Sequence, residues 1–369
     1  MREGWTYKKF EDCLVKAPKA KQVQTSQYNT GTKYPIVSQE DTLISGYFDD
    51  DAYLYHIDNP IVVFGDHTRV LKYIDFDFVV GADGVKILIP KEFLNAKLLY
   101  YYLLWYKIPN LGYSRHYKLL KEIDIPIPPL SEQQSIVAEL DKINELISLK
   151  KAQLSDLDSL AQSIFYDMFG DPIENEKGWE VKKLGEISTV KTGPFGSMLH
   201  KDDYISNGIP LVNPIHIKDY RIVADVNFTI SSEKAKELNN YILRRNDVIF
   251  ARRGDIGRCA VVSDVEDGYL CGTGSLFVRF EHKVIPQYVM YIIRSSSFIK
   301  ELISKAKGAT MLNLNSTIIA DLQIPLPPLS LQQDFAKRIE LIEQQKAQIS
   351  ATIKDLETLL ASRMQYWFD

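Results

Sequence analysis

Apolar residues recur at alternating intervals of three and four in two long stretches of the chain. The first series consists of Ile136, Leu140, Ile143, Ile147, Leu154, Leu157, Ala161, Ile164 and Met168. The second series, about 199 positions later, consists of Phe335, Ile339, Ile342, Ile349, Ile353, Leu356, Leu360 and Trp367. This spacing is that of a heptad seam and predicts two long helices, each with a narrow apolar stripe that needs a facing helix. Each helix is the other's natural partner in a coiled coil.

Each helix is predicted to begin at a repeated decapeptide, "IPIPPLSEQQ" at 125–134 and "IPLPPLSLQQ" at 324–333. The paired prolines favour an extended entry, because the residue before a proline is disfavoured in the α region. In both copies a serine then stands where the N-cap is expected, and a glutamine three residues later completes a capping box. The predicted capping residues are Ser131, Gln134, Ser330 and Gln333.

The segments in front of the two helices also begin alike, with "GWTYKKF" and "GWEVKKL". In both segments, apolar runs bounded by polar turns predict strands, and "NAKLLYYYLLWY" and "PQYVMYIIRSS" predict buried helices. A short helix at "SSEKAKELNNYIL" is expected only in the second segment. We therefore predict two copies of a mixed α/β (α+β) domain. The domains are expected at 1–124 and 171–323, and the helices at 125–170 and 324–369.

The order of domain, helix, domain and helix predicts how the helices are directed. If the ends of each compact domain lie near one another, the second helix must run back antiparallel to the first. The expected object is a dumbbell with two globular heads on an antiparallel two-helix coiled coil and an approximate internal twofold axis.

Composition narrows the class of protein. The 369 residues suit two domains, and 45% hydrophobic with 25% charged residues is ordinary for a globular chain. Neither a signal peptide nor a membrane span is predicted, so a cytoplasmic location is expected. The three cysteines, Cys13, Cys259 and Cys271, have no CxxC spacing and are interpreted as reduced structural thiols rather than a zinc site. The net charge of −4 means that any positive charge for nucleic acid must be local or supplied by another subunit.

The twin "PPLSxQQ" boxes that open long helices, alternating with two "GWxxxxL/F" domains, resemble the specificity subunit of type I restriction-modification systems. The resemblance covers essentially the whole chain. It implies that each domain is a target recognition domain for one half of a bipartite, asymmetric double-stranded DNA site. It also implies that the helices act as a ruler and as the docking surface for two methyltransferase subunits, which restriction subunits can join. Catalysis, with S-adenosylmethionine, Mg and ATP, would belong to those partners, so no cofactor is expected on this chain.

In the second domain, the loop "ARRGDIGR" is the leading candidate for base recognition. Arg252, Arg253 and Arg258 have the donors to contact guanine O6 and N7 or to bind phosphates; the alternative is a solvated hairpin tip. The loop "KTGPFGS" is not a P-loop, because it lacks the G-K-S/T ending. Lys191 and Thr192 are candidates for backbone contacts, and a structural turn is the alternative.

The corresponding turn of the first domain, "GDHTRVLK", offers His67, Thr68, Arg69 and Lys72 for DNA contact, against the alternative of a plain polar turn. A metal role for His67 is disfavoured, because no second ligand stands at a suitable spacing. The polar stretches before the two decapeptides supply further candidates, with helix capping as the alternative for the asparagines. These candidates are Arg115, His116, Lys118, Asn313 and Asn315.

Three charged residues, Lys150, Lys346 and Arg363, interrupt the apolar seam. They are expected to reach solvent or to fix the helix register, with a contact to a methyltransferase as the alternative. Acidic runs such as "FDDDAY" are interpreted as solvated turns rather than nuclease or metal sites. Two other function classes remain open: a fused restriction enzyme with its own activity, and a coiled-coil scaffold whose heads bind protein or sugar.

Overall fold

The computed structural model describes residues 2–112, 114–254, 256–281, 284–306 and 313–369. The chain divides into two compact units. The first comprises Met1–Ala152 together with Ile349–Asp369, and the second comprises Gln153–Gln348. Each unit therefore contains one predicted domain and part of both long helices.

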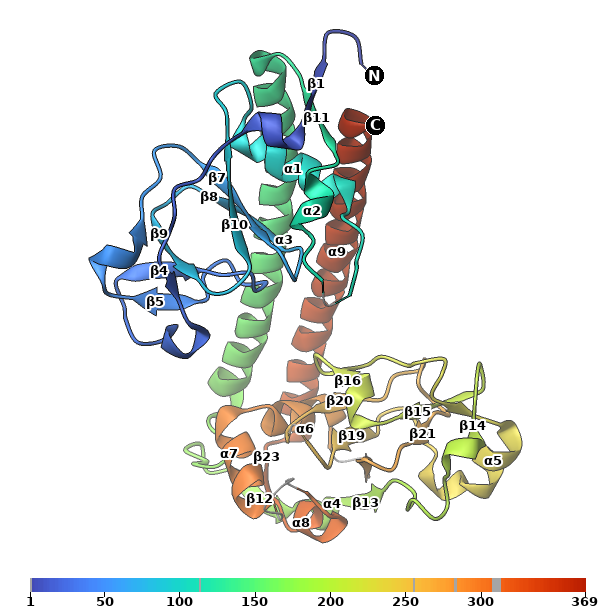
Figure 1. Ribbon diagram of the computed structural model, residues 1–369. Helices are drawn as coiled ribbons and strands as arrows, with labels where there is room; N and C mark the ends of the chain where they lie inside the picture. The colour runs from blue at the N-terminus through green and yellow to red at the C-terminus, as the bar shows by residue number, and fades with distance from the viewer. Residues whose placement is uncertain (1, 113, 255, 282–283, 307–312) are drawn as a thin grey trace. The chain divides into compact units, whose positions relative to one another are not determined.

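The first unit contains two small sheets and a strand pair. Its main sheet has the order β2-β10-β7-β8 and is antiparallel; the second has the order β3-β9-β4-β5, with β6 also on β9 (Figure 1). The strands are β1 Thr6–Lys9, β2 Leu14–Val15, β3 Gln22–Val23, β4 Tyr34–Val37, β5 Gly46–Phe48, β6 Leu54–Tyr55, β7 Ile61–Gly65, β8 Leu71–Ile74, β9 Phe78–Gly81, β10 Val85–Pro90 and β11 Asp124–Ile127. The helices are α1 Ala96–Tyr106, α2 Tyr117–Leu120 and the start of α3 Leu130–Phe169, and the short 3-10 helices are η1 Phe10–Cys13, η2 Thr25–Gln27 and η3 Asp51–Tyr53.

The second unit repeats this framework. Its sheet β13-β22-β19-β20 matches β2-β10-β7-β8. Its second sheet, β14-β18-β15-β21, has one parallel pair, β15 with β21, whereas the second sheet of the first unit has two, β3 and β4 with β9. The strands are β12 Glu180–Lys183, β13 Ser188–Thr192, β14 Tyr204–Ile205, β15 Ile209–Val212, β16 Ile217–Lys218, β17 Arg221–Ile222, β18 Thr229–Ile230, β19 Val248–Ala251, β20 Cys259–Val261, β21 Leu270–Cys271, β22 Ser275–Phe280 and β23 Gln323–Leu326. The helices are the end of α3, α4 Leu184–Ile187, α5 Ser232–Glu237, α6 Pro286–Ile293, α7 Ser296–Lys305, α8 Ser316–Ala320 and the start of α9 Leu329–Phe368, with 3-10 helices η4 Lys201–Asp203, η5 Pro214–His216 and η6 Asn239–Tyr241.

These elements confirm the predicted mixture of helix and strand in each domain. The apolar runs predicted as strands are β7 and β10 in the first unit and β19 and β22 in the second. The predicted buried helices are α1 and α6, and the short helix expected only in the second domain is α5.

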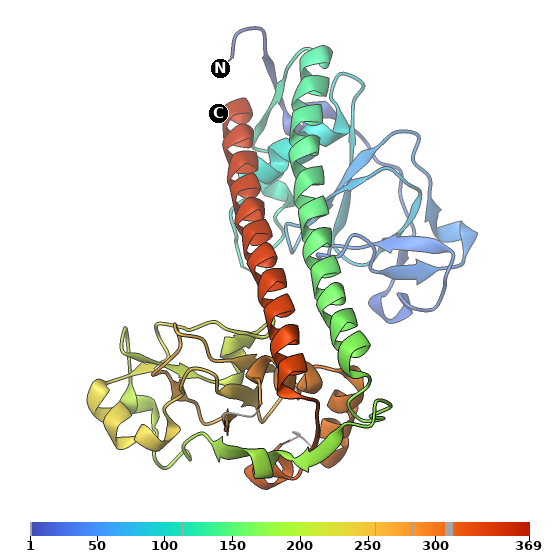
Figure 2. The same cartoon turned by 180° about the vertical axis from the view of Figure 1, so that it is seen from behind.

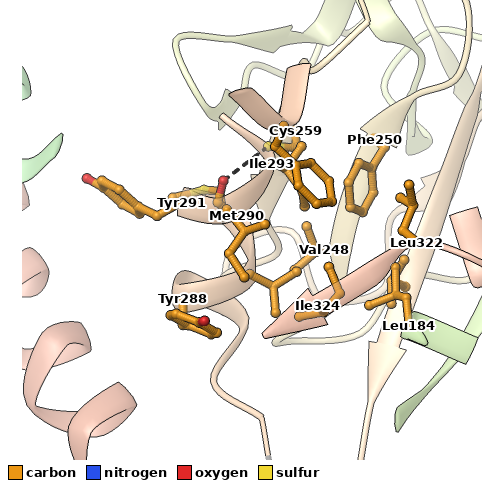
Figure 3. Close-up of a cluster of buried hydrophobic side chains, with 14 of the residues drawn as sticks. Leu184, Val248, Phe250, Cys259, Tyr288, Met290, Tyr291, Ile293, Leu322 and Ile324 are labelled. Carbon is orange, nitrogen blue, oxygen red and sulfur yellow. Dashed lines mark hydrogen bonds between the residues drawn. The ribbon is translucent and has the colours of Figure 1, made fainter. Parts of the chain in front are cut away.

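The core of the second unit forms where α6 packs on the sheet. Figure 3 shows Val248 and Phe250 of β19 and Cys259 of β20 in one cluster with Tyr288 and Met290 of α6. The predicted structural role of the cysteines is confirmed, because all three are buried and unpaired. Burial raises the pKa of the Cys259 thiol to about 12, so this thiol stays protonated at neutral pH.

The two long helices run antiparallel within each unit (Figure 2). In the first unit, Glu139 of α3 accepts hydrogen bonds from Arg363 and Trp367 of α9. In the second unit, Lys346 of α9 binds Asp158 of α3 at 2.8 Å. Two of the three predicted seam interruptions, Lys346 and Arg363, therefore form ion pairs between the helices.

The predicted seam residues lie on the less exposed side of each helix. All ten are buried or half-buried: Leu140, Ile143, Ile147, Leu154, Leu157, Ile339, Ile342, Ile349, Ile353 and Leu356. At the ends of the helices the buried positions lie one residue later than the expected Ile164, Met168 and Trp367. Phe165 and Phe169 enter the core of the second unit, and Met364 and Phe368 enter that of the first.

The predicted N-caps are wrong by at least one residue. α3 begins at Leu130 and α9 at Leu329, so Ser131 and Ser330 lie inside the first turn. The N–H of Gln133 donates to the carbonyl of Pro129 at 3.0 Å, which is already an i→i−4 helical bond. The expected capping glutamines, Gln134 and Gln333, are exposed.

The first glutamine of each "QQ" pair, rather than the second, is the structural one. Gln133 is fully buried: its amide donates to the carbonyls of Phe93 and Pro128, and its Oε1 accepts from the N–H of Asn95. Gln332 repeats this at α9, donating to Pro327 and accepting from the N–H of Ile285. Because Asn95 and Ile285 are the N-cap residues of α1 and α6, each buried glutamine ties a long helix to its domain.

Among the residues that the structure describes, no helix combines the length and the apolar composition needed to cross a membrane.

Candidate nucleic-acid interface

Three loops of the second unit meet at one end of the main sheet. They follow β13, follow β19 and precede β22. The N–H of Gly193 donates to the carbonyl of Ser275 at 2.9 Å, and the N–H of Arg252 donates to the carbonyl of Gly274 at 3.1 Å. A Cβ at residue 193 would lie 1.9 Å from the carbonyl oxygen of Gly272, so only glycine allows this approach.

The segment before α8 joins the same end of the sheet. The N–H of Leu314 donates to the carbonyl of Arg252 at 2.9 Å, and Asn313 forms a β-bridge with Arg253. Asn315 caps α8, because its Oδ1 accepts from the N–H of Ile318 at 2.9 Å. Of the alternatives for the asparagines, capping is therefore confirmed for Asn315, whereas DNA contact by Asn313 stays a prediction.

The three predicted arginines differ in exposure. Arg252 is only 8% exposed, and its Nε donates to the carbonyl of Thr273 at 3.1 Å. Burial lowers the pKa of Arg252 from its ordinary value. The expectation of a surface base-reading side chain is therefore wrong for Arg252, which instead ties two loops together. Arg253 and Arg258 are exposed and stay candidates for DNA contact.

The loop after β13 begins later than the sequence suggested. Lys191 and Thr192 are half-exposed residues of β13, opposite Phe277 and Leu276 of β22, rather than loop residues. The most exposed large apolar side chain of this loop is Phe195, which is 64% exposed and lacks the charge that marked the other candidates. An aromatic residue between two glycines in "GPFG" was the available signal.

The first unit repeats the backbone connections of this site with different side chains. The N–H of Asp66, after β7, donates to the carbonyl of Gly84 at 2.7 Å, and the N–H of His116 donates to the carbonyl of Asp66 at 2.8 Å. These bonds correspond to those of Arg252 with Gly274 and Leu314. The loop after β7 is therefore the structural equivalent of the arginine loop.

The predicted residues of the first unit's turn form hydrogen bonds with other segments of the same unit. The N–H of His67 and the hydroxyl of Thr68 both donate to Gln39, and Nη1 of Arg69 donates to the carbonyl of Ile108. Lys72 is 4% exposed, and its Nζ donates to the carbonyls of Ser38 and Thr42 at 2.8 and 2.5 Å. Burial lowers the pKa of Lys72. The expectation that Lys72 offers a surface charge is wrong, because the ammonium secures a loop.

The predicted candidates at the start of α2 comprise one structural and two exposed residues, of which Lys118 lies within α2 itself. His116 is fully buried, accepts from the N–H of Leu111 at Nε2 and lies 2.9 Å from the carbonyl of Asp66 at Nδ1. A carbonyl only accepts, so Nδ1 carries the proton. Arg115 and Lys118 are exposed and stay candidates for DNA contact. Within the described ranges, no group of three or more His, Cys, Asp or Glu side chains is arranged to hold a metal ion.

The family model described as the type I restriction modification DNA specificity domain matches residues 2–158 and 176–358. The chain belongs to this family. The specificity subunit of the type I restriction enzyme EcoR124I/EcoR124II from Escherichia coli is 22% identical over 94% of this chain and 88% of its own. Those of MjaVIII and MjaIX from Methanocaldococcus jannaschii are 24% and 27% identical over 66% and 70% of this chain. The match spans less than two thirds of these two relatives, 62% and 64%.

Solved structures of the same kind share the fold of this specificity-domain chain. The crystal structure of a type I restriction-modification S subunit from M. genitalium matches with a TM-score of 0.60 at 15% identity, covering 99% of this chain and 96% of that one. A chain solved in work on complex assembly and conformational transition of the type I R-M system gives a TM-score of 0.59 at 17% identity, covering 100% and 98%. At these identities the likeness shows the fold alone.

Proposed function

We propose that this chain is the non-catalytic DNA specificity subunit of a type I restriction-modification complex, in which each unit reads one half of a bipartite, asymmetric site. The main observation in support is that the two units share one backbone framework but differ in the side chains on the loops of that framework. The loop after β7 bears Asp66, His67 and Thr68, whereas its equivalent after β19 bears Arg252 and Arg253. Equivalent frames with unlike side chains suit the reading of two different sequences.

The long helices are proposed to set the distance between the half-sites. Each has 40 residues. At 1.5 Å per residue, such a helix is roughly 60 Å long, the length of roughly 18 base pairs at 3.4 Å each. The same helices are proposed to dock two methyltransferase subunits, with which restriction subunits associate.

Catalysis is assigned to those partners. They would bind S-adenosylmethionine, Mg and ATP, and the complex would act in the cytoplasm. The net charge of −4 supports a shared DNA channel, because an acidic chain needs basic partner surfaces to neutralise phosphates. Arg253, Arg258, Arg115 and Lys118 are then the local cations that this chain contributes.

A domain exchange tests the proposal. Residues 178–323 are replaced by the equivalent domain of another specificity subunit, and the chimera is produced with its methyltransferase. Genome-wide mapping of methylated bases should show one half-site changed and the other retained. A change in both half-sites, or in neither, would contradict separate reading by the two units. The chain with an exchanged first domain, residues 1–124, is the reciprocal control.

A further inference from the structure

Phe195 is an exposed aromatic side chain on the turn that leaves β13. It is 64% exposed, and the carbonyl of Phe195 accepts from the N–H of Met198 at 2.8 Å, which closes the turn beneath it. Gly196 follows, and a Cβ there would meet no atom within 4 Å, so the turn faces open space. Leaving a phenyl ring in water forgoes the burial that usually stabilises such a residue.

The turn belongs to the same loop cluster as the exposed arginines. Gly193 packs against Gly272, and the loop of Gly272 to Gly274 holds Arg252 by two hydrogen bonds. Arg253, next along the chain, is exposed. An apolar ring and cations on the loops of one cluster suit duplex DNA, in which stacked bases lie between phosphates.

We propose that Phe195 inserts its ring at a base-pair step of the half-site read by the second unit, partly unstacking it. Apolar side chains that act in this way kink the duplex and favour flexible pyrimidine–purine steps. Phe195 then determines specificity through the deformability of the DNA, whereas Arg253 and Arg258 contact base edges or phosphates. This inference rests on the proposed function and adds a second mode of recognition to it.

The first unit carries different chemistry at the equivalent place. The chain that leaves β2, "KAPKAK", has exposed Lys16, Lys19 and Lys21 and contains no aromatic residue. Lysines there suit phosphates, which are present at every base step. Unstacking is therefore expected at one half-site only.

The test uses the complete complex with its methyltransferase subunits and a duplex carrying the methylated site mapped in the host genome. 2-Aminopurine is placed at successive positions of both half-sites, and its fluorescence reports unstacking. Outside the methylated bases, which a methyltransferase flips out of the stack in either half-site, the native complex should raise fluorescence at one step of the second unit's half-site and at none of the first. Phe195→Ala should abolish the rise and weaken specific binding roughly 5- to 100-fold. Phe195→Leu, which keeps an apolar wedge, should lose less.

Val265→Ala is the matched control. Val265 is 73% exposed and lies in the loop at the other end of β20 from Arg258, so its loss should change neither fluorescence nor affinity. Specific binding without any rise in fluorescence, or a rise that persists in Phe195→Ala, would overturn the inference alone. A native complex that shows no preference for the mapped duplex over a scrambled one would overturn the proposed function as well.

Discussion

Asp66 and Arg252 occupy the same place in the two units with opposite charge. Each lies just beyond its strand, is almost completely buried and makes the same pair of backbone hydrogen bonds. Asp66 accepts from the N–H of Tyr117 at 2.8 Å, and Arg252 donates to the carbonyl of Thr273. Because both charges are used to hold loops, the recognition chemistry must come from their exposed neighbours.

Substitution of the adjacent arginines should separate these roles. Arg253→Ala should weaken DNA binding by the complex, roughly 5- to 100-fold if Arg253 reads a guanine, without changing stability. Arg252→Ala should instead lower the free energy of unfolding by about 1–3 kcal/mol, because it removes a buried hydrogen bond and its packing. Urea denaturation and DNA titration at fixed salt measure the two effects. Equal losses of affinity with unchanged stability in both variants would contradict the assignment.

The sequence indicated the candidate loops for DNA contact but not which of their side chains are exposed. "ARRGDIGR" and "GDHTRVLK" were recognised because charged residues follow apolar strands. The burial of Arg252 and Lys72 depends on carbonyls of Thr273, Ser38 and Thr42, which reach them only through tertiary folding. Phe195 lacks the charge by which the other candidates were chosen.

At the scale of elements, the junction between each domain and its long helix depends on a buried glutamine. Gln133 forms hydrogen bonds with two carbonyls and one N–H, and its own side chain is fully buried. Gln332 forms the same kind of junction at α9. An unsatisfied buried polar group is costly, so this side chain fixes how the helix leaves the domain.

Gln133→Leu should therefore destabilise the chain by about 2–4 kcal/mol, since three polar partners lose their hydrogen bonds. Gln134→Leu, at the exposed neighbouring position, should change stability by less than about 0.5 kcal/mol. Urea denaturation of both variants measures the difference. If the two substitutions cost the same, Gln133 does not hold the junction.

The helix pair of the first unit contains a pH-sensitive contact. Hydrogen bonds from Arg363, and then from Trp367, lower the pKa of Glu139 from its usual 4.5. A lowered folded-state pKa stabilises the protein above about pH 4.5, and this contribution is lost as pH falls through the folded value. Glu139→Gln should therefore be less stable than the native chain at about pH 7, and the difference should shrink towards about pH 3.

Chemical denaturation at a series of pH values measures this difference, with Glu357→Gln as control. Glu357 also pairs with a lysine of the other helix, Lys151, but both side chains are more than half exposed. Exposed pairs contribute little, so this variant should follow the native curve. A Glu139→Gln penalty that does not depend on pH would contradict the electrostatic explanation.

The long helices were predictable because heptad spacing is a strong local signal. The first residues of these helices were harder to predict. Pro129 and Pro328 supply the first carbonyl acceptors, so the helices begin before Ser131 and Ser330, which resemble N-caps in the sequence. The buried positions shift to Phe165 and Phe169 because these large rings pack into the core of the second unit. Heptad spacing reports only contacts between the two helices, so it could not predict this packing against the domain.

At the scale of the whole molecule, the acidic net charge of −4 should limit the proposed binding to DNA, because phosphates repel an acidic surface. The isolated chain should bind DNA weakly, and the complex with methyltransferase should bind with a steeper decline of log affinity against log salt, because more phosphates are neutralised. Titrations at several salt concentrations give both slopes. Tight, sequence-specific binding by the isolated chain would contradict the idea of a channel completed by partners.

The first unit is made of two separate stretches of the chain, and this determines which unit can fold first during synthesis. Its core includes Met364 and Phe368, which the ribosome makes after the whole of the second unit, whereas the second unit is one continuous stretch. At 5–20 residues per second, roughly 10–40 s separate Ala152 from Ile349. In a nascent chain, all residues of the second unit are therefore synthesised before those that complete the first. Until the last turn of α9 leaves the ribosome, the apolar surface of the first unit that packs against Phe368 is exposed and can bind chaperones.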